Sequence, residues 1–117
     1  MQVNRALFMK VTKDFWNWEL LPPELFVIGN VNPNWYLSEF LLTFPQALRD
    51  FLGKSIVVND WADGGGLINR GARMPDCAIG GKLSMHKFLK AVDVNVKGLT
   101  QPDVLGVVLK NRDKFQM

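Results

Sequence analysis

The segment from Gly81 to Val96, GKLSMHKFLKAVDVNV, holds residue types that bind metals or perform catalysis. His86 is the single histidine of the 117-residue chain, and Asp93 follows it among three valines. The alternation of valines with polar residues over 92–96 predicts a strand with one buried face. Because aspartate is disfavoured in strands, a strand that keeps one usually uses its charge. The order Ser84, His86, Asp93 therefore indicates a metal or catalytic site.

These residues also have structural interpretations, which stay open beside the chemical one. A lone histidine is by default a structural or surface residue. Asp93 has an alternative as a strand carboxylate paired with a nearby arginine or lysine. For Arg70 we prefer the simpler interpretation, a solvated loop cation or a partner of Asp60, Asp63 or Asp76.

Composition indicates one globular domain over residues 1–117. Hydrophobic residues make up 48% of the chain and charged residues 21%, which argues against disorder. The net charge is +3, and the basic residues are scattered, so we expect no nucleic-acid partner. The single cysteine, Cys77, excludes an internal disulfide and a CxxC metal site. Apolar runs are too short for a signal peptide or a membrane span, so we expect cytoplasmic synthesis and no membrane partner.

Local patterns predict an α+β fold in which helices pack around a small antiparallel sheet. Strands are expected at about 55–59 and 90–96, where β-branched residues concentrate. Helices are expected near 12–19, 38–52 and 101–113.

Capping residues and apolar faces support the two later helices. Thr43 is expected as an N-cap with Pro45 in the first turn, and Gly53 as the terminating glycine. Thr100 is expected to cap the last helix. The buried face of that helix is expected to comprise Val104, Leu105, Val108 and Leu109.

A glycine-rich loop is expected over residues 60–81, and its length indicates a functional loop. Trp61, near its start, is expected to cover the core. For Trp16, Trp18 and Trp35 we prefer packing in the core or an interface over a glycan-binding face.

The chain resembles the zinc D-Ala-D-Ala carboxypeptidases and L-alanyl-D-glutamate endopeptidases of bacterial cell walls and phage endolysins. The family motif S-x-H-x-x-G-x-A-x-D is matched by Ser84, His86, Ala91 and Asp93. The run GARMPD at 71–76 is similar to the family's G-Y-R-S-P-E turn. The resemblance covers about residues 38–114, which leaves 1–37 as an N-terminal extension.

This resemblance implies a hedgehog/D-Ala-D-Ala peptidase fold and a zinc peptidase that acts on peptidoglycan peptide stems. His86 and Asp93 would be zinc ligands, and zinc-activated water would attack a peptide carbonyl. Arg73 would bind the substrate carboxylate or the oxyanion, and Ser84 would orient the substrate or the histidine. A phage protein of this kind would act at the cell wall after lysis or as part of a virion.

The chain departs from the family pattern at two points. Leu89 replaces the motif glycine, and the family's third ligand, a histidine near the C-terminus that follows an acidic general base, has no counterpart. Three explanations remain open. The chain is a fragment completed by a second chain; it is a non-catalytic structural or interaction protein, such as a virion component; or Cys77, Asp76 or a C-terminal acid replaces the ligand.

Overall fold

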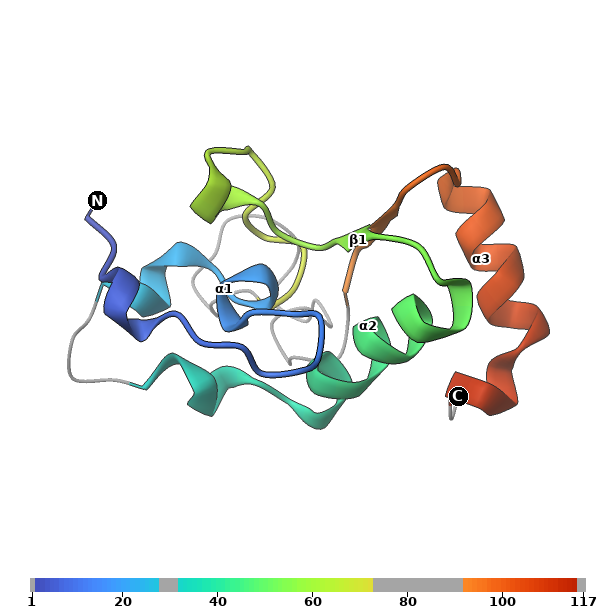
Figure 1. Ribbon diagram of the computed structural model, residues 1–117, viewed down its shortest axis with the longest axis horizontal. Helices are drawn as coiled ribbons and strands as arrows, with labels where there is room; N and C mark the ends of the chain where they lie inside the picture. Colours follow the sequence, from blue (N-terminus) through green and yellow to red (C-terminus); the bar gives the residue numbers. More distant parts are fainter. Residues whose placement is uncertain (1, 28–31, 73–91, 116–117) are drawn as a thin grey trace, which may run out of the picture.

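The computed structural model describes residues 2–27, 32–72 and 92–115, which form a small compact α+β fold (Figure 1). Within these ranges lie three α-helices and one two-stranded antiparallel sheet. The helices are α1 (Asn17–Leu20), α2 (Glu39–Leu52) and α3 (Gln101–Lys110), and the strands are β1 (Ile56–Val57) and β2 (Asn95–Val96). In Figure 1, α1 lies toward the N-terminal end of the molecule and α3 at the opposite end, with the strand pair between them. The α+β prediction is therefore confirmed.

The sheet pairs the two segments that the sequence pattern indicated. Ile56 lies opposite Val96 and Val57 opposite Asn95. Each strand has only two residues, so the expected ranges of 55–59 and 90–96 were too long. The predicted alternation is confirmed, because Val94 and Val96 are buried while Asp93 and Asn95 are exposed.

Helix α2 begins earlier than Thr43, which corrects the expected N-cap. The side chain of Ser38 accepts a hydrogen bond from Leu41 N, while the Thr43 hydroxyl donates to Glu39 O from inside the helix. The helix continues through Pro45, and Leu41 and Leu48 on either side of this proline are both fully buried. Gly53 ends it with a φ of 64°, as predicted.

Helix α3 has the expected cap but a narrower buried face. The Thr100 hydroxyl accepts from Asp103 N at 3.3 Å, and the Asp103 carboxylate accepts from Thr100 N at 3.1 Å. Val104 and Val108 are buried, whereas Leu105 and Leu109 are 59% and 52% exposed. The prediction for these two leucines is wrong, because only one side of the helix packs against the core.

The prediction of a helix over 12–19 is also wrong, because the chain there first forms an isolated β-bridge between Lys10 and Trp16. Thr12 accepts a hydrogen bond from Phe15 N and donates to Gln46, so it stabilises a tight turn. Only the single turn α1 follows. The apolar residues of this segment have no helical period, and long-range packing decides their conformation.

The buried side chains form two clusters. The first joins the sheet to α2 and α3 and contains Phe15, Leu20, Leu48, Ile56, Val58, Val94, Val96, Val104 and Val108. The second lies around the N-terminal segments and contains Leu21, Leu25, Phe26, Leu41 and Ala72. Strand β2, which follows Asp93, is therefore anchored in the first cluster. No helix in the described ranges has the length and apolar character needed to cross a membrane.

Candidate functional site

Asp93 is the one predicted site residue that lies within the described ranges. Arg73, Ser84 and His86 lie outside them, as do the motif residue Ala91 and the turn position Leu89. The alternative ligands Asp76 and Cys77 also lie outside. The structure therefore describes the candidate site from its aspartate and from the segments that hold this aspartate.

Asp93 lies two positions before β2, at the surface. Its side chain is 48% exposed, and its carboxylate Oδ2 is 3.8 Å from Nε of Arg70. Its backbone N–H donates to the carbonyl of Arg70 at 2.7 Å. The ion-pair interpretation of Asp93 is thus confirmed, and the exposed carboxylate keeps the chemistry of an oxygen ligand for a divalent metal.

Among the described residues, Arg70 pairs with an acid other than the expected Asp60 and Asp63, while the third expected partner, Asp76, lies outside the described ranges. Arg70 pairs with Asp93, while Asp60 accepts a hydrogen bond from Leu67 N within its own loop. The Nη2 group of Arg70 also donates to the side-chain oxygen of Asn95 at 3.1 Å. With a side chain that is only 22% exposed, Arg70 is a well-contacted residue and not a solvated loop cation.

Asn59 is a supporting residue that the sequence reasoning missed. It is 1% exposed, its Oδ1 accepts from Arg70 N at 3.0 Å, and its Nδ2 donates to Leu21 O at 3.1 Å. A polar residue at the end of the β-branched run 55–59 was the available signal. Because a buried amide is costly unless hydrogen-bonded, Asn59 fixes the backbone at Arg70 to the core.

The start of the glycine-rich loop is held against the core. Trp61 donates through Nε1 to Leu21 O at 3.0 Å, and its ring contacts Phe8, Trp18 and Phe26. The expectation that Trp61 covers the core is confirmed. The same loop approaches α1 closely, because a Cβ added at Gly71 would overlap the carbonyl oxygen of Leu20.

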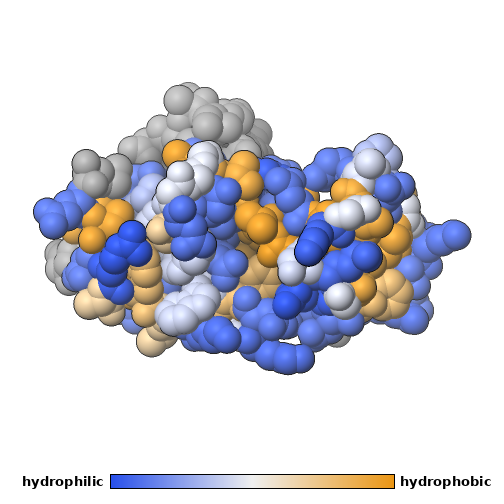
Figure 2. Space-filling model, turned by 45° about the horizontal axis from the view of Figure 1, so that its top comes forward, coloured by the Kyte–Doolittle hydropathy of each residue, from blue (hydrophilic) through white to orange (hydrophobic). Residues whose placement is uncertain are grey.

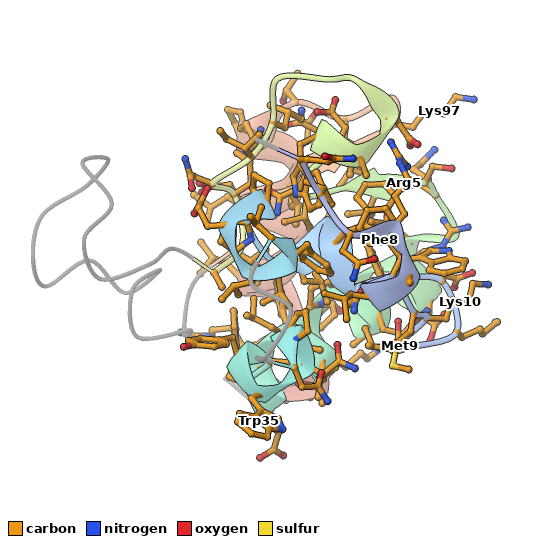
Figure 3. The ribbon with its side chains drawn as sticks, turned by 90° about the vertical axis from the view of Figure 1, so that its left-hand side faces the viewer. Arg5, Phe8, Met9, Lys10, Trp35 and Lys97 are labelled. Atoms are coloured by element: carbon orange, nitrogen blue, oxygen red, sulfur yellow. The ribbon has the colours of Figure 1, made fainter. Side chains whose placement is uncertain are left out.

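The other tryptophans divide into a packed and an exposed group. Trp18 is partly buried against Phe8 and Trp61, which confirms core packing for this residue. Trp16 is 39% exposed and Trp35 is 77% exposed. Figure 3 shows the ring of Trp35 projecting from the body of the molecule.

Three carboxyl groups among the described residues have pKa values shifted from their ordinary ones. Burial raises the pKa of Glu19, although its carboxylate also accepts a hydrogen bond from Trp16 N. A hydrogen bond from Gln46 lowers the pKa of Asp14, and hydrogen bonds from Thr100 lower that of Asp103. The shift of the Glu19 pKa follows from burial, and those of Asp14 and Asp103 follow from hydrogen bonds in a turn and a helix cap, so none of them identifies a catalytic acid or base.

Metal-ligating side chains do not converge in the described part of the chain, where no group of three or more His, Cys, Asp or Glu residues could hold a metal ion. Asp93 fits one ligand position by its exposure and its oxygen chemistry. Comparison of the chain with family models, curated proteins and solved structures gives no match. The case for a function therefore comes from the motif residues and from the setting of Asp93.

Proposed function

We propose that the chain is a zinc-dependent, peptidoglycan peptidase-like domain with a hedgehog/D-Ala-D-Ala peptidase type of fold. The observation that carries the proposal is the combination of the Ser84, His86, Ala91, Asp93 order with the setting of its aspartate. Asp93 is exposed two positions before strand β2, and the buried side chains of Val94 and Val96 anchor the backbone that follows it in the core. A ligand carboxylate needs such a rigid, accessible position.

The proposed residue roles follow the chemistry of each side chain. Zinc would supply a Lewis acid that activates water at neutral pH. His86 and Asp93 would bind it through nitrogen and oxygen. Arg73 would bind a carboxylate of the peptide stem or the negative charge that develops on the attacked carbonyl, and Ser84 would orient the substrate or the histidine.

A catalytic zinc site usually has three protein ligands and one open position. The chain contains one histidine, so the third ligand is proposed to come from Asp76, from Cys77, from a C-terminal acid or from a second chain. Zinc titration of the separate Asp76→Asn and Cys77→Ser variants distinguishes these sources. Loss of affinity in one variant assigns that residue, and unchanged affinity in both points to the other two sources.

Hydrolysis of purified peptidoglycan tests the activity. His86→Ala and Asp93→Asn should each abolish peptide-bond cleavage by the zinc-loaded protein, while circular dichroism shows an unchanged fold. Asp63→Asn is a matched control, because it removes an exposed carboxylate from the 3-10 helix at Trp61–Asp63 and is not among the proposed ligands. Wild-type turnover in either site variant would exclude the proposed roles.

A second candidate is a non-catalytic structural or interaction protein, for example a virion component. Two observations favour it: the single histidine of the chain, and the exposed pair Leu105 and Leu109 on α3. Figure 2 shows that hydrophobic residues interrupt the polar surface in separate patches. A zinc-free protein that assembles with other phage proteins would support this candidate. In either case we propose that the protein acts at the cell wall after lysis or as part of a virion.

A further inference from the structure

Helix α3 exposes a row of apolar residues on the side that faces away from the core. Leu105 is 59% exposed, and Leu109, one helical turn further along, is 52% exposed. Pro102 and Gly106 are also exposed, and their spacing puts them on the same side of the helix. Figure 1 shows α3 at one end of the molecule, where its outer side is accessible to another molecule. An apolar row at this spacing is suited to packing against a second helix.

Gly106 lies between the two leucines at a position where the fold itself does not require a glycine. Its backbone is helical, and no described residue lies within 4 Å of a Cβ atom built there. A glycine inside a helix lowers stability relative to alanine, and nothing in the described part of the chain compensates for this cost. Glycine does, however, allow another backbone to approach closely. Its presence in the apolar row therefore favours a contact with a partner helix.

Two opposite charges flank the apolar row. Asp103 in the first turn and Lys110 in the last turn are two helical turns apart, so they lie on one face about 10.5 Å from each other along the axis. Both are exposed, and neither forms a salt bridge with another described residue. The Asp103 carboxylate accepts a hydrogen bond from Thr100 N, and a carboxylate has capacity for further donors. The face thus carries a negative charge toward one end and a positive charge toward the other.

We propose that two copies of the chain associate through α3, with the two helices antiparallel about a two-fold axis near Gly106. A two-fold contact uses the same patch twice, so the patch must complement itself. The antiparallel arrangement places Asp103 of each copy opposite Lys110 of the other, and Leu105 beside Leu109 of the other. A parallel arrangement would bring like charges together. The charge pattern of α3 therefore fits a second copy of the same helix, and Gly106 lets the two backbones come close at the axis.

The dimer is expected to be weak and dependent on concentration. Helix α3 has 10 residues and is about 15 Å long. A contact confined to two such helices falls short of the roughly 1,000 Å² of buried area that is typical of stable complexes. Association through α3 does not depend on the proposed zinc site, so the two can be tested separately.

Sedimentation velocity of the full chain, in the presence of a chelator and at concentrations up to about 1 mM, measures this association. The wild type should shift from monomer to dimer without forming larger species, because a two-fold contact closes on itself. A chain whose α3 binds only a different protein would stay monomeric. A monomeric wild type over the whole range, or growth into larger species, would therefore overturn the proposal.

Variants of the apolar row and of the flanking charge locate the interface. The double variant Leu105→Ser/Leu109→Ser should raise the dissociation constant at least about 10-fold, because each copy loses two leucine side chains from the contact. Met9→Ser is the matched control, since Met9 is 51% exposed outside α3. Lys110→Glu should also weaken the dimer, because it places two carboxylates opposite each other, whereas Lys97→Glu changes an exposed lysine outside α3 and should not.

Gly106→Gln separates a role in the interface from a purely structural role. Glutamine is the better helix former, so the monomer should unfold at a higher temperature than the wild type. The longer side chain keeps the two backbones apart, so the dissociation constant should rise. Thermal unfolding at low concentration and sedimentation at high concentration measure both effects. Wild-type dimerisation by this variant, or by the double leucine variant, overturns the proposed face and leaves the peptidase proposal intact.

Discussion

The carbonyl oxygen of Leu21 accepts hydrogen bonds from two side chains, which makes it a direct test of how the glycine-rich loop is held. Asn59 Nδ2 donates at 3.1 Å and Trp61 Nε1 at 3.0 Å. Leu21 is fully buried. Because each donor keeps the oxygen paired when the other is removed, the variants Asn59→Ala and Trp61→Phe should not have independent effects on the free energy of unfolding.

The expected magnitude follows from the hydrogen bonds that each variant loses. Asn59→Ala removes its bonds to Leu21 O and Arg70 N and should cost about 2–3 kcal/mol. Trp61→Phe removes one bond and part of a ring, which should cost about 1–2 kcal/mol. Only the double variant deprives the oxygen of both donors. An unpaired buried carbonyl costs about 1–3 kcal/mol, so the double variant should lose about 1–2 kcal/mol more than the sum.

Urea unfolding of the wild type, both single variants and the double variant measures this coupling energy as a double-mutant cycle. A second cycle with Trp35→Phe in place of Trp61→Phe is the control, because Trp35 is 77% exposed. The control cycle should be additive within about 0.5 kcal/mol. Additive losses in the Asn59 and Trp61 cycle as well would refute the shared role of Leu21 O.

Three further variants test the N-cap of α3, the close approach of Gly71 to Leu20 O, and the buried carboxyl group of Glu19. Thr100→Ala should lower the free energy of unfolding by about 1 kcal/mol through loss of the helix cap, as measured by urea unfolding, with Thr100→Ser as the conservative control. Gly71→Ala should cost about 1–3 kcal/mol, because the new methyl group would overlap Leu20 O, while Gly66→Ala has open space and should be nearly neutral in thermal unfolding. Burial raises the pKa of Glu19 above 4.5, so wild-type stability should fall as pH rises from 4.5 through the raised pKa. A pH series of unfolding curves should show that Glu19→Gln flattens this fall, and an identical pH dependence in the variant would contradict the assignment.

The parts of the fold that the sequence predicted well depend on local chemistry. The alternation of Val94 and Val96 with polar neighbours located β2, because a strand with one buried face has a period of two. Gly53 and Thr100 marked helix ends, since left-handed backbone and side-chain capping favour these residue types.

Features that depend on distant residues were missed or wrong. The segment around Thr12 forms a turn because its hydroxyl binds Gln46, which lies far along the chain. Leu105 and Leu109 have the spacing of a buried helix face, yet the core reaches only Val104 and Val108. No local pattern identifies such a partner or its absence.

The candidate site shows the same division between local and long-range information. Its residue order could be read from the sequence, and Asp93 was correctly expected on the exposed side of the alternating segment, although it lies two positions before β2 and not within a strand. The partnership of Arg70 with Asp93 and Asn95 joins the loop to β2 across the fold. Only the three-dimensional structure reveals that contact.

Metal content tests the proposed function most directly. The full chain, purified without chelator and without a metal-affinity tag, is analysed by elemental mass spectrometry, and its thermal unfolding is followed with and without added zinc. We predict stoichiometric zinc in the wild type, a rise in melting temperature on zinc addition to the chelator-treated protein, and loss of both in Asp93→Asn. A wild-type protein without stoichiometric zinc, whose unfolding is indifferent to added zinc, would contradict the zinc-peptidase proposal.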